Sequence, residues 1–118
     1  MKLLTALIAV SVISCGQVDG VKSTSWRSNP IVDFSTSEQI IETWAFHSSL
    51  NQVTITRRLF NDTLVDTTTY TYTLDGDAFI LNGSQRVSYT KVSDNQNFIV
   101  DSYGGRNYAK PMHFGRQF

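Results

Sequence analysis

Few side chains in this sequence belong to the types that catalyse reactions or bind metals. The chain has one cysteine, Cys15, and two histidines, His47 and His113, which lie far apart with no cysteine or carboxylate at a metal-ligand spacing from either. The motifs of activated nucleophiles, zinc metalloproteases and phosphate-binding loops are absent from the sequence. We therefore predict no catalytic residues, no metal site and no cofactor, and we expect that the protein is not an enzyme.

Cys15 follows an N-terminal segment that is typical of an export signal. Lys2 supplies one positive charge, and residues 3–13 form an uncharged, mainly apolar run. A run of this length matches the apolar part of a secretory signal and is too short to span a bilayer, which needs about 20 residues. The run ends at Ser14, a small residue directly before Cys15. The sequence therefore predicts a signal peptide over residues 1–14.

The segment Val12–Gly16 resembles the lipobox of bacterial lipoproteins. In that family the cysteine thiol is alkylated with a diacylglycerol, and the signal is then cut on the N-terminal side of the cysteine. The resemblance implies a membrane anchor of several palmitate-like chains on Cys15, and two or more chains hold a protein stably at a membrane. Because Gly16 and Gln17 follow the cysteine, it also implies the outer membrane, facing the periplasm. The alternative is that Cys15 ends a simple signal peptide.

The composition of the mature chain limits its size and its partners. Removing residues 1–14 from the 118 residues leaves 104, which is enough for one domain with a modest core. The whole chain has ten basic and ten acidic side chains and a formal net charge of +0, with no arginine-rich run. This balance lacks the positive footprint that nucleic-acid binding requires, so we expect no nucleic-acid partner.

Residues 15–29 are mostly small and polar, and we predict that they form a flexible tether to a folded domain over residues 30–118. Trp26 is the exception within the tether. We expect it to cap one end of the domain, and the alternative is a position at the membrane interface. The domain is predicted to open with a short helix. Ser35–Glu38 has the S-x-x-E spacing of a capping box, and Ile40, Ile41 and Trp44 follow at a spacing that suits one to two helical turns.

The rest of the chain has the pattern of an all-β protein. Threonines and aromatic residues are abundant, helix formers are few, and turn signals recur about every ten residues. The dipeptides Asp75-Gly76 and Asn82-Gly83 are the strongest signals for two-residue type I′ turns. The predicted strands are Thr43–Ser48, Gln52–Phe60, Leu64–Leu74, Ala78–Leu81, Ser84–Val92, Asn97–Tyr103 and Arg106–Lys110, the last ended by Pro111. We expect an antiparallel up-and-down meander of about seven to eight strands that closes into a small barrel, because closure removes exposed edges.

The segment from about Phe34 to Lys110 resembles the lipocalin-like domains of bacterial envelope lipoproteins. The resemblance rests on Trp44 after a short helix, on the run Thr69–Leu81, and on the later segments Tyr89–Ser93 and Asn107–Lys110. It implies an up-and-down barrel in which a helix plugs one end and Trp44, on the first strand, packs at the bottom. It also implies that the barrel interior is a candidate ligand site.

Six aromatic residues are the candidate ligand-binding residues, because pockets for small molecules are mostly apolar with a few polar groups. They are Trp44, Phe46, Tyr70, Tyr72, Phe79 and Tyr89. They predict a cavity behind Tyr70 and Tyr72 and a non-enzymatic, lipid-anchored protein that binds a small apolar or amphiphilic molecule. The same residues are equally suited to filling the interior, which side chains can occupy completely in a barrel of this size.

A filled interior would favour the alternative function, that of a protein-interaction module. Gly83–Tyr89 faintly echoes the lipoprotein inhibitors of lysozyme, which are also short β barrels, so a periplasmic enzyme inhibitor is one form of this alternative. It predicts functional loops at Gly83–Ser88 or Gly104–Asn107. The pair Arg57-Arg58 places one charge on each face of its strand. The inward arginine is expected to meet either a carboxylate ligand or a carboxylate of the chain, Asp66 or Asp101.

Overall fold

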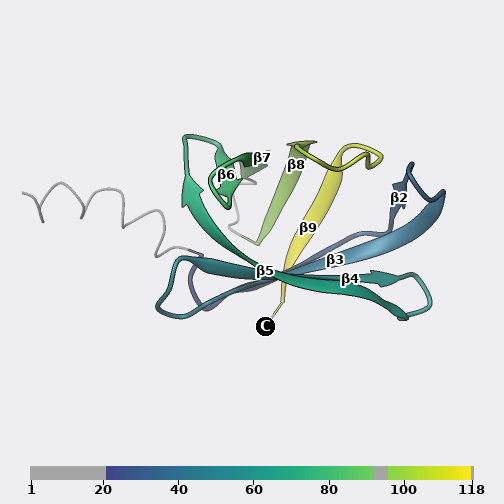
Figure 1. Cartoon of the computed structure of the whole chain (residues 1–118), viewed down its shortest axis with the longest axis horizontal. Coiled ribbons are helices and arrows are strands. Elements are labelled where there is room, and N and C mark those ends of the chain that lie inside the picture. The colour runs from purple at the N-terminus through teal and green to yellow at the C-terminus, as the bar shows by residue number, and fades with distance from the viewer. Residues whose placement is uncertain (1–20, 92–95, 118) are drawn as a thin grey trace, which may run out of the picture.

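The computed structural model describes residues 21–91 and 96–117, and this part of the chain is all-β (Figure 1). Helices are absent from these residues, and therefore so is any helix long and apolar enough to cross a membrane. The strands are β1 (Ser25–Ser28), β2 (Ile31–Asp33), β3 (Glu38–Phe46), β4 (Gln52–Leu59), β5 (Leu64–Leu74), β6 (Ala78–Leu81), β7 (Gln85–Lys91), β8 (Asn97–Tyr103) and β9 (Met112–Gln117).

Eight of these strands form a closed antiparallel barrel. Strands β3 to β9 pair in sequence order, and β1 closes the sheet by pairing with both β9 and β3. In that closure Trp26 lies opposite Trp44 on one side and opposite Arg116 on the other. The remaining strand, β2, follows β1 and pairs with the first residues of β3, so that Ile31 lies opposite Ile40. The prediction of a closed up-and-down barrel is thereby confirmed, with β2 as an additional strand.

The two ends of the barrel carry different loops, because neighbouring antiparallel strands turn at alternate ends. The near end is the end of the barrel that carries residues 21–24, the β3–β4 turn and the β5–β6 turn. At the near end the backbone N–H of Ser23 donates to the carbonyl of His47. We call far end the one with the β2–β3, β4–β5 and β6–β7 turns and the β8–β9 loop. At the far end the N–H of Phe34 donates to the carbonyl of Asn107.

Alternation along the strands directs one set of side chains into the barrel. On β3, Ile40, Glu42, Trp44 and Phe46 point inward and are buried. The other strands and the β8–β9 loop, which supplies Tyr108, contribute mainly apolar and aromatic side chains to the same core, namely Trp26, Ile31, Val53, Ile55, Tyr72, Phe79, Leu81, Val87, Phe98, Val100, Tyr103, Tyr108, Met112 and Phe114. Glu42 is a fully buried charged side chain within this interior, and Asp33 on β2 is buried as well.

The short helix predicted after Ser35 is wrong. Residues 34–37 form a turn, and β3 begins at Glu38. The carboxylate of Asp33 accepts the N–H of Ser35 at 2.9 Å, and Ser37, with a φ of 63°, donates its N–H to the carbonyl of Asp33. A short polar side chain that satisfies nearby N–H groups stabilises a turn as readily as a helix start. The alternation on β3 then gives an extended strand.

The last predicted strand, Arg106–Lys110, is also wrong. These residues belong to the β8–β9 loop, and the final strand β9 begins directly after Pro111. The loop backbone bonds to β2 instead, through the N–H of Ala109 and the carbonyl of Val32. Proline has no N–H to donate to a ladder, so it suits the residue before a strand as well as the residue after one.

The predicted tether does not extend to residue 29, because residues 25–28 form β1. Trp26 therefore sits on the first barrel strand, where it is buried and packs edge-on against Phe98 at 5.0 Å between ring centroids. Trp44 lies on the second barrel strand, β3, and not on the first. The signal peptide and Cys15 lie outside the described residues.

Candidate functional site

The predicted ligand-binding aromatics meet in the near half of the barrel. Trp44, Phe46, Tyr72 and Phe79 are almost fully buried, whereas Tyr70 and Tyr89 are partly buried at the edge of the same cluster. The ring of Phe79 lies 5.6 Å from that of Trp44 and 5.5 Å from that of Phe46, and it stacks on Tyr89 at 4.8 Å. The structure thus brings the six residues together.

The same rings fill the section of the barrel that they occupy. Trp44 contacts Phe114 across the interior at 5.5 Å, and Phe114 stacks on Phe98 at 4.7 Å with the ring planes 5° apart. Tyr72 packs edge-on against Phe46 at 5.2 Å. Aromatic pairs at these separations are in direct contact and contribute to stability beyond the area they bury. The section between Trp44 and Tyr72 is therefore occupied by side chains.

A buried polar network lies next to this aromatic core, in the far half of the barrel. Its centre is Glu42, whose side chain is fully buried. The Glu42 carboxyl group accepts hydrogen bonds from Trp44 Nε1 at 2.8 Å, from the Tyr103 hydroxyl at 3.1 Å and from the Tyr108 hydroxyl at 2.8 Å. The backbone N–H of Glu42 donates to Ser28 Oγ at 2.9 Å. Glu42 thereby connects β1, β3, β8 and the β8–β9 loop.

Arg57 and Asp66 extend this network toward the surface. Arg57 on β4 donates from Nε to Asp66 Oδ1 at 2.9 Å and from Nη2 to Asp66 Oδ2, which makes a bidentate ion pair with β5. Its Nη1 donates to the Tyr108 hydroxyl at 3.3 Å. The expected pairing of the inward arginine with Asp66 is confirmed. Tyr108 therefore receives a hydrogen bond from Arg57 while it donates one to Glu42.

Burial controls the protonation of this network. It raises the pKa of Glu42 above its ordinary value, because the charged form loses its hydration, while the hydrogen bonds from Trp44, Tyr108 and Tyr103 oppose the shift. Burial, together with the charge of Glu42, also raises the pKa values of Tyr103 and Tyr108. Both phenols therefore stay protonated and remain hydrogen-bond donors at physiological pH.

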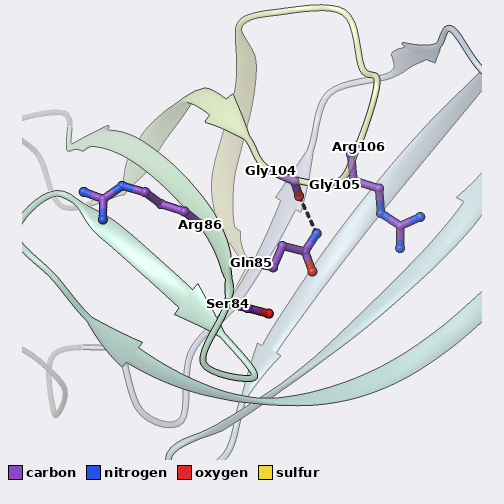
Figure 2. A pocket seen from close by; sticks show the side chains of 6 residues that line it. All are labelled: Ser84, Gln85, Arg86, Gly104, Gly105 and Arg106. Carbon is purple, nitrogen blue, oxygen red and sulfur yellow. Dashed lines mark hydrogen bonds between the residues drawn. The ribbon is translucent and has the colours of Figure 1, made fainter.

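An open pocket lies at the far end, between the β6–β7 turn and the β8–β9 loop (Figure 2). It is lined by Ser84, Gln85, Arg86, Gly104, Gly105 and Arg106. Two hydrogen bonds join its walls: the Gly104 N–H donates to the Arg86 carbonyl at 2.7 Å, and Gln85 Nε2 donates to the Gly104 carbonyl at 2.6 Å. The two loops that the sequence suggested for an interaction protein, Gly83–Ser88 and Gly104–Asn107, are thus neighbours in the structure.

Large apolar side chains are also exposed at the far end. Phe34 in the β2–β3 turn is 58% exposed, Phe60 in the β4–β5 turn is 64% exposed, and Leu64 at the start of β5 is 52% exposed. Phe34 is tied to the pocket loop through its backbone hydrogen bond to Asn107. The far end therefore combines a cationic pocket with apolar tips.

The histidines take no part in either cluster. His47 Nδ1 accepts the backbone N–H groups of Ser49 and Leu50 at 3.1 and 3.0 Å, which shapes the β3–β4 turn. Within residues 21–91 and 96–117, no three histidine, cysteine or acidic side chains gather as a metal site would require.

The chain matches no protein-family model, no characterised protein and no solved structure.

Sequence reasoning missed Glu42, Tyr103 and Tyr108, whereas Arg106 belongs to the suggested loop Gly104–Asn107 but was not singled out within it. A signal for Glu42 was present, because it occupies an inward position in the alternating series Ile40, Glu42, Trp44 and Phe46. That alternation was hidden by the expected helix over the first of these residues. No comparable signal marks Tyr103 or Tyr108, which reach Glu42 only through closure of the barrel.

Proposed function

We propose that this chain is a lipid-anchored protein of the bacterial cell envelope, attached through Cys15 in the outer membrane and facing the periplasm. In this proposal the barrel is a non-enzymatic protein-interaction module that binds its partner through the far end. The lipobox-like segment Val12–Gly16 after an apolar run supports the anchor. The structure of the barrel supports the choice of surface.

The observation that carries the interaction proposal is the placement of the two ends. Residue 21 lies at the near end, and only five residues separate it from Cys15, so that the six Cα–Cα steps between them reach about 20 Å when fully extended. An anchor at Cys15 would hold the near end toward the lipid surface, so the far end would face the periplasm. The far end carries exposed Phe34, Phe60 and Leu64, and exposed apolar groups that gather on one surface are typical of interaction sites.

The packing of the interior favours this function over the carrier function. A carrier of a small apolar molecule needs room behind Tyr70 and Tyr72, and the rings of Phe46, Tyr72 and Phe79 contact one another in that region. Native mass spectrometry of the full chain purified from its own host tests the choice. A protein without added mass is expected, whereas a co-purified small molecule that dissociates on unfolding would favour the carrier.

The anchor is tested by metabolic labelling with a fatty-acid analogue. The wild-type chain is expected to incorporate the label, and the Cys15→Ser variant is expected to lose it, because a serine hydroxyl is not a substitute for the thiol nucleophile. A Ser11→Ala variant, four residues earlier in the signal, is the matched control and should be labelled normally. Labelling of Cys15→Ser would disprove lipidation at this position.

The interaction surface is tested by photo-crosslinking in living cells. A photoreactive amino acid is placed at Phe34 or Phe60 at the far end, and at Leu50, which is 51% exposed in the β3–β4 turn of the near end. Discrete protein adducts are expected from the two far-end positions and not from Leu50. Adducts from all three positions, or from Leu50 alone, would contradict the proposal.

Inhibition of a purified lysozyme by the full chain tests the enzyme-inhibitor form of the function directly.

A further inference from the structure

Arg106 stands apart from the other arginines of the far end in its bonding. Arg57 forms its bidentate pair with Asp66, Arg58 lies 4.0 Å from Asp62, and Arg86 donates to Asp75 at 2.8 Å. For Arg106, neither an ion pair nor a hydrogen-bond partner for its buried Nε is found among the described residues. Buried donors in folded proteins almost always have a partner, so one that lacks it is a candidate for binding something from outside the chain.

The carboxylates near Arg106 accept their hydrogen bonds from other residues. Glu42, the nearest carboxylate of the core, already accepts three hydrogen bonds from Trp44, Tyr103 and Tyr108. Asp66 is engaged by Arg57. Burial and the like charge of Arg57 act against the Arg106 cation, whereas Tyr108, Tyr103 and Glu42 favour it, so the pKa of Arg106 is raised on balance. Arg106 therefore lies beside two tyrosine hydroxyls that donate elsewhere and a cation that is already paired. An added anion would supply the missing acceptor.

The pocket holds Arg106 on a well-defined frame. The Gly104 N–H donates to the Arg86 carbonyl, and the Gly104 carbonyl accepts from Gln85 Nε2. A Cβ atom on Gly104 would lie 2.8 Å from the Arg86 carbonyl oxygen. Figure 2 shows Arg86 and Arg106 extending in opposite directions from this contact. The two cations therefore do not compete for one ligand, and Arg86 is already satisfied by Asp75.

We infer that Arg106 is the cationic anchor of a carboxylate-binding site at the far end of the barrel. The guanidinium group presents Nε and one Nη as a planar fork that matches the two oxygens of a carboxylate. Arg106 is half-buried and lines the pocket together with Ser84. In the proposed bound state the Arg106 side chain turns so that Nε, which is buried in this structure, faces the pocket, where Ser84 adds a hydroxyl group. Phe34 does not line the pocket, but its backbone N–H donates to the carbonyl of Asn107, the residue after Arg106. Its exposed ring is the apolar group that we assign to a ligand extending beyond the pocket.

The test is a titration of the ¹⁵N-labelled full chain in an uncharged detergent, followed through the arginine Nε–H signals. Sodium acetate is the probe, and sodium chloride at equal ionic strength is the control. A saturable downfield shift of the Arg106 Nε–H signal is expected, because this N–H gains an acceptor. The Arg57 Nε–H signal should stay in place, because it is already bonded to Asp66 at 2.9 Å.

Variants assign the effect to Arg106, with the backbone amides of Gly104 and Gly105 as the readout. Arg106→Gln is expected to weaken acetate binding by about tenfold or more, and Arg106→Lys by less, because lysine keeps the charge but loses the fork. Arg86→Gln is the matched control from the same pocket and should change the affinity by less than about twofold, because Arg86 is already paired.

Two results would overturn the site: the same shifts with chloride as with acetate, or unchanged acetate binding by a folded Arg106→Gln variant. If that variant fails to fold, the wild-type titration against chloride decides alone.

Sodium benzoate distinguishes the source of the carboxylate. Binding about tenfold tighter than acetate would indicate a free organic acid with an apolar group beside its carboxylate. Equal affinities for acetate and benzoate would indicate that the site contacts only the carboxylate group. Such a site would suit the acidic side chain of a protein partner.

Discussion

The carboxyl group of Glu42 accepts a hydrogen bond of 2.8 Å from the hydroxyl of Tyr108, which lies 66 residues later in the chain. This bond joins β3 to the β8–β9 loop inside the barrel, and the hydroxyl of Tyr103 joins β8 to the same carboxyl group. The buried acid therefore links strands at the start and at the end of the meander, close to where β1 closes the sheet.

Removing the Glu42 carboxyl group is expected to destabilise the barrel strongly. Glu42→Ala would leave the donors of Trp44, Tyr103 and Tyr108 buried without an acceptor, and we expect the free energy of unfolding to fall by about 3 kcal/mol. Glu42→Gln keeps one acceptor oxygen and should cost about half as much. Urea unfolding measures both. Glu38→Ala, at an exposed position of the same strand, is the control, and a Glu42→Ala variant as stable as this control would contradict the assigned role.

Glu42 should also make the stability of the barrel depend on pH. Burial raises the pKa of Glu42 in the folded chain above its ordinary value of 4.5. Above 4.5, therefore, the unfolded state loses the proton more readily than the folded state. The contribution of Glu42 is full below 4.5 and decreases as the pH rises toward the pKa of the folded state. The stability of the wild type relative to Glu42→Gln should thus fall as the pH rises above 4.5. A constant difference over this range would contradict the raised pKa.

Asp66 is expected to show the opposite pH dependence. Its ion pair with Arg57 lowers the pKa of Asp66 below its ordinary value of 3.8, so its contribution is present above that value and is lost as the pH falls. Because the Asp66 side chain is 39% exposed, solvent weakens the pair, and Asp66→Asn should cost about 0.5–1 kcal/mol at neutral pH and less at about pH 3. Asp62→Asn, at the exposed 4.0 Å pair with Arg58, is the control and should be neutral at both pH values.

Local patterns were sufficient to predict much of the barrel. The bounds of β5, β6 and β8 were predicted as the structure has them, because turn residues flank alternating or apolar runs. The expected type I′ turn at Asn82-Gly83 has positive φ at both residues, 51° and 78°. At Asp75-Gly76 only Gly76 has positive φ, so that turn spans Asp75–Ala78 instead, closed by the bond from the Ala78 N–H to the Asp75 carbonyl.

The elements and contacts that depend on closure could not be predicted in this way. Strand β1 has four residues and β2 has three, too few to show a period, and both are stabilised by pairing with β3. The site has the same limitation. A glutamate in a strand is normally assigned to the solvent face, and the partners that bury Glu42 lie 61 and 66 residues away in sequence. Such a contact becomes visible only when the barrel has closed.

Gly104 gives a final prediction, because the close contact of the pocket loops requires the absence of a side chain there. A Cβ atom on Gly104 would lie 2.8 Å from the Arg86 carbonyl oxygen and 3.2 Å from its nitrogen, so Gly104→Ala must displace backbone and should cost about 2 kcal/mol. Gly76→Ala is the control, because nothing lies within 4 Å of a Cβ atom at that position. An alanine at its φ of 60° should cost about 1 kcal/mol, and Gly76→Asn should recover most of that stability because asparagine tolerates a positive φ. Thermal unfolding and the Gly105 amide signal measure both effects. If the close contact causes the loss of stability, Gly104→Asn should be as unstable as Gly104→Ala. A Gly104→Asn variant that is more stable than Gly104→Ala would show that backbone conformation is the cause instead.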